Sequence, residues 1–132
     1  MRSCVVGEPT EAQHAIAREL VAVQDEQLAA MRPGASARDI DAIVRDPLIK
    51  KGLRPHYDNI TGYTLGFYPA STQRISDFTH IFTPAADWEL REGMTLHMYT
   101  SAAGLAFSET VAVTATGIER LTRSERKLFA TG

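Results

Sequence analysis

The chain has 132 residues, 44% of them hydrophobic, and a formal net charge of −2 at pH 7. A chain of this length buries roughly two thirds of the surface that its unfolded form exposes, so we expect a single domain over residues 1–132. Its Lys and Arg residues are spread along the sequence and form no basic stripe for phosphates, which argues against a nucleic-acid partner. The single cysteine, Cys4, cannot form an internal disulfide, and neither a membrane-spanning apolar run nor a leader is present, so we expect a cytoplasmic protein without a membrane partner.

The N-terminal part predicts an edge strand followed by a long helix. Residues 2–7 are β-compatible and Pro9 closes them. Thr10 and Gln13 fit a capping box, in which the hydroxyl and the amide satisfy two backbone donors at a helix start. The apolar residues behind it recur at near-helical spacing, at Ile16, Leu20, Val23, Leu28 and Met31. We therefore predict a helix over residues 10–31 that stops at Pro33-Gly34.

A second helix is predicted to open at Ser36 and Asp39 and to end at Gly52. Pro47 should kink or restart this helix, because the proline ring clashes with the preceding turn. Residues 53–60 then indicate a strand or an extended chain.

Three segments alternate polar or aromatic residues with aliphatic ones and predict strands, namely residues 59–69, 93–99 and 105–114. Residues 70–91 lack periodicity, and their length predicts a lid over a site or an interface. Residues 118–121 predict a return strand, and Thr122 with Glu125 fits another capping box, which predicts a last short helix. Two helices beside an antiparallel sheet make an α+β architecture.

Several motifs, in order along the chain, carry a family resemblance. They are Gly62-Tyr63-Thr64-Leu65-Gly66, Glu92-Gly93-Met94 and the tail from Ser108 to Thr122. They resemble the C-terminal half of the pita-bread hydrolases, the superfamily of methionine aminopeptidase, Xaa-Pro dipeptidase, creatinase and ectoine hydrolase. The glycine-flanked motif, with Tyr68-Pro69 and Trp88-Glu89, is most similar to the ectoine hydrolase branch. The resemblance implies a shortened pita-bread domain, with a curved antiparallel sheet and two main helices on one face.

For the peptidases of this superfamily, the resemblance implies a two-metal site of two Asp, one His and two Glu, whose bound water ionises near neutral pH. The His position is Tyr63 in this chain, and the two Glu positions are Tyr99 and Ser108, with Glu109 one place along. The two Asp belong to strands before the first helix, and none of the nine residues before Thr10 is Asp. We therefore expect no metal and no cofactor, and Glu109 becomes a ligand only if a bulge turns it to the site.

Creatinase, by the same resemblance, is a precedent for metal-free acid–base cleavage of a C–N bond. If Tyr99 faces the cavity, strand alternation sends His97 to the same side. Leu96 and Met98 then point to the helices. We predict His97 as the general base, with Tyr99 or Glu109 as the acid. The alternative for His97, a hydrogen-bonded structural histidine, carries equal weight.

The residues predicted to bind substrate are His56, Tyr63, Tyr68, Trp88 and Ser108. Trp88 would stack on a planar or cationic group, but a tryptophan buried in an interface fits its position equally well. For His56, the alternative is a loop histidine at a strand entry.

These residues predict a metal-independent hydrolase, cyclase or isomerase that acts on a C–N bond of a small cyclic or amidine-like molecule. Two alternatives stay open, a ligand-binding pseudo-enzyme without turnover and a C-terminal fragment of a longer Xaa-Pro peptidase-like or ectoine hydrolase-like protein. The expected partner is a small polar nitrogenous molecule. We also expect a homodimer, because a shortened sheet leaves an edge strand that needs a cover. The apolar residues expected at this interface are Phe78, Ile81, Phe82 and Trp88.

Overall fold

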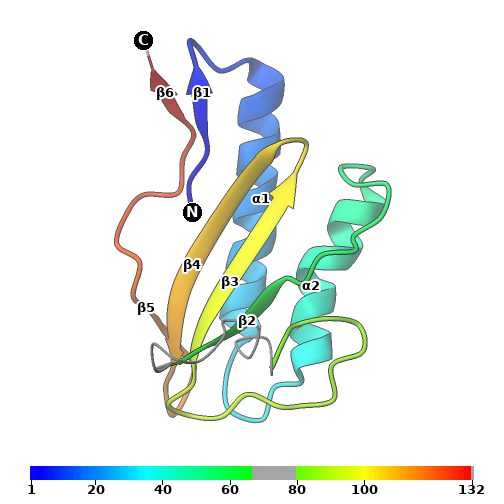
Figure 1. Ribbon diagram of the computed structural model, residues 1–132, viewed down its shortest axis with the longest axis vertical. Coiled ribbons are helices and arrows are strands. Elements are labelled where there is room, and N and C mark those ends of the chain that lie inside the picture. The colour runs from blue at the N-terminus through cyan, green and yellow to red at the C-terminus, as the bar shows by residue number, and fades with distance from the viewer. Residues whose placement is uncertain (67–79, 132) are drawn as a thin grey trace, which may run out of the picture.

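The computed structural model describes residues 1–66 and 80–131 (Figure 1). Its elements, in chain order, are β1 (Cys4–Val6), α1 (Glu11–Ala30), α2 (Ala37–Lys50), β2 (Gly62–Leu65), β3 (Thr95–Ala102), β4 (Leu105–Val113), β5 (Ile118–Arg120) and β6 (Phe129–Thr131). Within these residues, the strands form an antiparallel sheet in the order β2-β3-β4-β5 and a parallel pair, β1 with β6. This arrangement confirms the α+β class.

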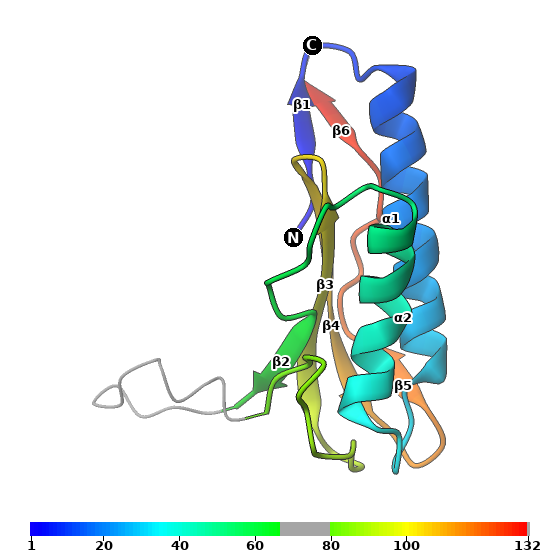
Figure 2. The same cartoon turned by 90° about the vertical axis from the view of Figure 1, so that its right-hand side faces the viewer.

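Both helices lie on the same face of the larger sheet, as Figure 2 shows. α1 packs along β3 and β4, and α2 packs beside α1. The helix-facing residues Leu96 and Met98 of β3 are fully buried in a core that includes Leu28, Ile40 and Phe82. The predicted alternation of β3 is therefore confirmed. Among the described residues, no helix covers the other face of this sheet.

The helix starts follow their predicted capping residues. Thr10 Oγ1 accepts a hydrogen bond from Gln13 N, and Gln13 Oε1 accepts one from Thr10 N, so the capping box is confirmed. Ser36 Oγ accepts from Asp39 N at the start of α2. Each cap satisfies a backbone donor that the first helical turn leaves without a partner.

Pro47 neither ends nor restarts α2, which is continuous from Ala37 to Lys50. The proline removes one helical hydrogen bond, but Val44 and Leu48 on either side of it are fully buried. Burial of two such side chains contributes roughly 3–6 kcal/mol, which outweighs one missing bond. Neither α1 nor α2 is long and apolar enough to cross a membrane.

Two predicted elements are wrong. Residues 53–60 form no strand. Their backbone is held by hydrogen bonds from the Arg45 side chain to the carbonyls of Tyr57 and Asn59, and not by a neighbouring strand. The last short helix is also absent, because residues 121–128 are irregular and lead into β6. The hydroxyl of Thr122 accepts from Thr110 N at 2.8 Å, so it serves the edge of β4 and not a helix start.

Two of the residues predicted to form a dimer interface pack within the fold instead. Phe82 is fully buried in the core, and the Trp88 ring packs edge-on against it at 4.9 Å. The outer edge of β2 is bonded by the chain itself, since Phe82 N donates to Gly62 O at 2.9 Å. Phe78 lies outside the described residues. The homodimer stays a prediction, without support from Phe82, Trp88 or this edge.

Candidate functional site

Polar side chains collect on the sheet face that the helices leave uncovered. His97 of β3 lies opposite Tyr63 of β2 and Thr110 of β4. Tyr99 of β3 lies opposite Ser108 of β4. Residues that oppose each other in an antiparallel ladder share a face. We call this surface the polar face, and it consists of Tyr63, Thr95, His97, Tyr99, Ser108 and Thr110.

His97 is at the centre of the polar face. Its ring centroid lies 5.1 Å from that of Tyr63 and 5.9 Å from that of Tyr99. Burial lowers the pKa of His97 below its ordinary value of 6.5, because a partly dehydrated site disfavours the charged form. Burial likewise raises the pKa of Tyr99 from 10.0 to about 12. Near neutral pH, the pair combines a neutral imidazole that accepts a proton with a protonated phenol that donates one.

β2 reaches its place beside β3 because Gly62 has no side chain. A Cβ atom at this position would lie 2.6 Å from Met98 Sδ and 2.9 Å from His97 O. Only a glycine tolerates so close an approach of another backbone. The register that sets Tyr63 opposite His97 therefore depends on this glycine.

A buried polar network, which the sequence reasoning missed, positions the part of β3 that extends past the start of β2. Arg45 binds Asp41 through two bonds, Nε to Oδ2 at 2.6 Å and Nη2 to Oδ1 at 2.9 Å. Thr61 Oγ1 donates to Asp41 Oδ1 at 2.6 Å, and Thr61 O accepts from Tyr99 N at 3.0 Å. α2 is thereby linked through Thr61 to the backbone of Tyr99. The spacing of four between Asp41 and Arg45, typical of a helical ion pair, was the available signal.

Glu109 lies on the opposite face of the sheet from His97, which corrects its predicted role as an acid beside that histidine. The β3–β4 ladder keeps one register over its whole length, so no bulge turns Glu109 toward the polar face. Its side chain is fully buried, and its carboxylate lies 2.7 Å from Arg2, 3.4 Å from Arg120 and 3.7 Å from Arg126. These contacts make Glu109 the centre of an ion cluster that joins both ends of the chain to β4.

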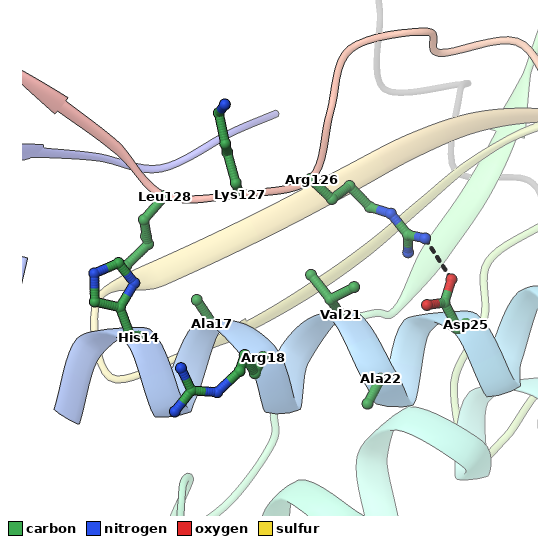
Figure 3. Close-up of a pocket in the computed structure, with 9 residues that line it drawn as sticks. All are labelled: His14, Ala17, Arg18, Val21, Ala22, Asp25, Arg126, Lys127 and Leu128. Atoms are coloured by element: carbon green, nitrogen blue, oxygen red, sulfur yellow. Dashed lines mark hydrogen bonds and ion pairs between the residues drawn. The ribbon is translucent and has the colours of Figure 1, made fainter. Parts of the chain in front are cut away.

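A groove of about 310 Å³ lies between α1 and the segment before β6 (Figure 3). Cations reach it from both sides, but each one is already paired with a carboxylate. The pairs are Arg18 with Glu11, Arg126 with Asp25, and Lys127 with Glu125. The groove therefore offers a ligand no unpaired cation, and one of its ion pairs, Arg126 with Asp25, joins the C-terminal segment to α1.

Two residues predicted to bind substrate are placed apart from the polar face. The His56 side chain lies on a loop and is 72% exposed. The Trp88 ring packs on Phe82, and its Nε1 donates to Ile81 O at 3.0 Å. The position of His56 matches its alternative, a loop histidine. Trp88 packs within the fold, so neither stacking on a ligand nor burial in an interface is shown for it. Tyr68, a third predicted binding residue, lies outside the described residues.

The polar face does not supply the donors of a two-metal centre. Tyr63, Tyr99 and Ser108 stand where the resemblance expects an imidazole and two carboxylates, and they bring two phenols and a hydroxyl. His97 adds one nitrogen donor. Two divalent ions need several carboxylates, and no three His, Cys, Asp or Glu side chains are grouped to bind a metal within residues 1–66 and 80–131. The described residues by themselves do not fit such a centre.

Comparisons with known proteins agree with the fold and with the motifs. The family model described as metallopeptidase family M24 matches residues 1–115. The Xaa-Pro dipeptidases of Pyrococcus horikoshii and Pyrococcus furiosus are 26% and 28% identical over 133 residues. Each match covers 97% of this chain and only 36% of the relative. The crystal structure of dipeptidase PepE from Mycobacterium ulcerans aligns with a TM-score of 0.82 at 22% identity, over 98% of this chain and 34% of that one.

Proposed function

Because this chain belongs to metallopeptidase family M24 while its described part lacks the donors of a two-metal centre, we propose a metal-independent enzyme that acts on a C–N bond of a small cyclic or amidine-like molecule. The observation that supports this proposal is the pair of His97 and Tyr99, whose ring centroids lie 5.9 Å apart on one face. Their pKa shifts leave the base neutral and the acid protonated near neutral pH. Within the family, we place the chain with the ectoine hydrolase branch.

In the hydrolytic form of the reaction, His97 takes a proton from a water molecule while the water oxygen attacks the electrophilic carbon. The C–N bond breaks, and the leaving nitrogen receives a proton from Tyr99. The imidazolium of His97 then returns its proton to the phenolate. Both side chains are restored, and one water molecule has been added across the C–N bond. Tyr63 lies beside His97 and supplies a hydroxyl donor to the oxygen that gains charge. Ser108 is buried, and its hydroxyl accepts a hydrogen bond from the N-terminal ammonium of Met1.

Binding without turnover is a second candidate function. It is favoured by the absence of a carboxylate from the polar face as described, since Glu109 faces the helices. Tyr99, with a pKa of about 12, is a weak proton donor at neutral pH. In this case the polar face holds a small polar nitrogenous molecule unchanged. The coverage of 36% of the relatives is compatible with a third candidate, a segment of a longer peptidase-like protein.

Turnover in the presence of a chelator tests the proposal. We expect cyclic amidines or guanidines to be hydrolysed in EDTA, at a rate that falls by about two to four powers of ten in His97→Gln. His14→Gln, a change at an exposed histidine of α1, is the control and should keep full turnover. A requirement for added manganese or cobalt, or full activity of His97→Gln, would contradict the proposal. Saturable binding without turnover would favour the second candidate.

A further inference from the structure

We propose that the polar face continues into a subsite for a carboxylate group, held by Arg54 at the hairpin end of β3 and β4. The subsite rests on the proposed function in one respect, which is that His97 and Tyr99 act on the other end of the same ligand. Arg54 was not among the predicted site residues, because the hairpin against which it lies is distant in the sequence.

Arg54 carries a positive charge that the described chain does not neutralise. Its Nη1 donates to Ser101 Oγ at 3.1 Å and to Ser101 O at 3.4 Å, and its Cζ lies 4.0 Å from the centroid of the Tyr57 ring. Arg45 lies 4.8 Å from the same ring, but Asp41 binds it through two bonds. Within residues 1–66 and 80–131, no carboxylate forms an ion pair with Arg54 as Asp41 does with Arg45. Of the two guanidiniums on Tyr57, only Arg54 is left to attract an anion.

An open groove of about 500 Å³ lies in front of this guanidinium. It runs between the segment that follows α2 and the β3–β4 hairpin, which lie side by side in Figure 1. The residues that matter in its lining are Arg54, Asn59, Ser101, Gly104 and Ala106. The volume is sufficient for a small organic molecule.

The groove adjoins the polar face through Ser101. Side chains alternate along β3, so Ser101 points to the same side as Tyr99 and His97. Ser101 is two residues from Tyr99, which is roughly 7 Å along a strand. A molecule with its carboxylate on Arg54 therefore extends along β3 toward Tyr99.

The chemistry of the lining selects a carboxylate over a phosphate. Arg54 is the one charged residue of the described lining, and a planar guanidinium matches a planar carboxylate with two parallel hydrogen bonds. A phosphate dianion normally needs more, such as several backbone N–H groups or a second cation. The ligand class that fits both ends of the site is a small nitrogenous carboxylate, with its carboxylate at Arg54 and its C–N group on the side of Tyr99.

Titration by NMR with N-acetylglycine tests the subsite independently of turnover. In the parent protein at constant ionic strength, we expect saturable shifts of the Ser101, Gly104 and Ala106 amide resonances. The uncharged N-acetylglycinamide should bind at least tenfold more weakly. Arg54→Gln should lose tenfold or more in affinity for N-acetylglycine, and Arg54→Lys should lose less. Arg38→Gln, a change at an exposed arginine of α2, is the charge-matched control and should bind as the parent does.

Any titration result that differs from these expectations overturns the proposed subsite. Equal binding of N-acetylglycine and its amide to the parent protein excludes carboxylate recognition, even if Arg54→Gln fails to fold. Inorganic phosphate that binds more tightly than N-acetylglycine shows a general anion site. Failure of the proposed function is distinguishable, because the preference of the parent protein for N-acetylglycine over its amide is measured without turnover. If His97→Gln keeps turnover while Arg54→Gln loses binding, the proposed chemistry falls and the subsite stands.

Discussion

Met98 of β3 and Glu109 of β4 lie directly opposite each other in the ladder, so a buried carboxylate shares the helix-facing side of the sheet with a fully buried methionine. A charge in such a place costs several kcal/mol unless partners compensate it. Arg2 and Arg126, whose side chains are 12% and 9% exposed, supply that compensation. The result is a clamp in which β4, the chain before β1 and the segment before β6 share one ion cluster.

Replacing Glu109 by Gln removes the negative charge that Arg2 and Arg126 share. Arg2 then has no carboxylate partner among the described residues, and Arg126 keeps only its pair with Asp25. We expect the free energy of unfolding to fall by about 3 kcal/mol, the order found when one partner of a buried ion pair is removed. Urea denaturation measures this change. Glu11→Gln, which breaks only the exposed pair with Arg18, should give no measurable change. If Glu109→Gln is as stable as the parent but inactive, Glu109 belongs to the chemistry after all.

Gly62→Ala tests the close approach of β2 to β3. The added methyl group would meet Met98 Sδ at 2.6 Å, a flexible side chain that can move, and His97 O at 2.9 Å, a backbone atom that cannot move alone. We expect a loss of roughly 1–3 kcal/mol, as for overpacking in a core, together with weaker ligand binding at His97. Gly117→Ala, where a Cβ meets no atom within 4 Å, is the control for loss of a glycine. Unchanged stability of Gly62→Ala would show that β2 is not held against β3 as described.

The sequence predicted the parts of this molecule that depend on local geometry. The capping box of Thr10 and Gln13 lies within one helical turn, and the alternation along β3 depends only on a period of two. Both were therefore available from a short stretch of residues. The same local reading failed for Thr122, because its partner, Thr110 N, lies on a neighbouring strand that competes with a helix start.

The site required long-range information that local patterns do not contain. Glu109 is adjacent to Ser108 in the sequence, and only the pairing of β3 with β4 fixes which of the two shares a face with His97. Arg54 meets Ser101 across 47 residues, and no periodicity connects these positions. The resemblance aligned positions along the chain, but the register and the ion pairs decided which side chains meet.

Ala103→Asn tests strain in the β3–β4 hairpin that borders the proposed subsite. Ala103 and Gly104 connect the two strands with φ values of 48° and 79°, as in the hairpin turns that favour Asn-Gly. Left-handed backbone costs an L-residue other than Asn roughly 1 kcal/mol. We expect Ala103→Asn to raise the free energy of unfolding by about 0.5–1 kcal/mol, measured in urea, and Ala103→Val to lower it. Equal stability of the Asn and Val variants would contradict a left-handed conformation at this residue.

The charge state of His97 should give the stability a defined pH dependence. Burial places its folded-state pKa below 6.5, whereas in the unfolded chain it titrates near the ordinary value. Above pH 6.5 both states hold a neutral imidazole, and His97 adds no pH dependence. As the pH falls below 6.5, the unfolded state takes up the proton first, so stability decreases until the pH also passes the folded-state pKa. Urea denaturation should show this decrease in the parent protein and a smaller one in His97→Gln.

The same shift predicts the acidic side of the activity profile. A general base works while it is neutral, so the lower limb of kcat/KM against pH should fall below pH 6.5 and follow the folded-state pKa of His97. NMR titration of the His97 ring gives that pKa directly, and the two midpoints should agree. A ring midpoint at or above 6.5 would show that His97 is not desolvated on the polar face. A kinetic limb that persists unchanged in His97→Gln would assign the base to another residue.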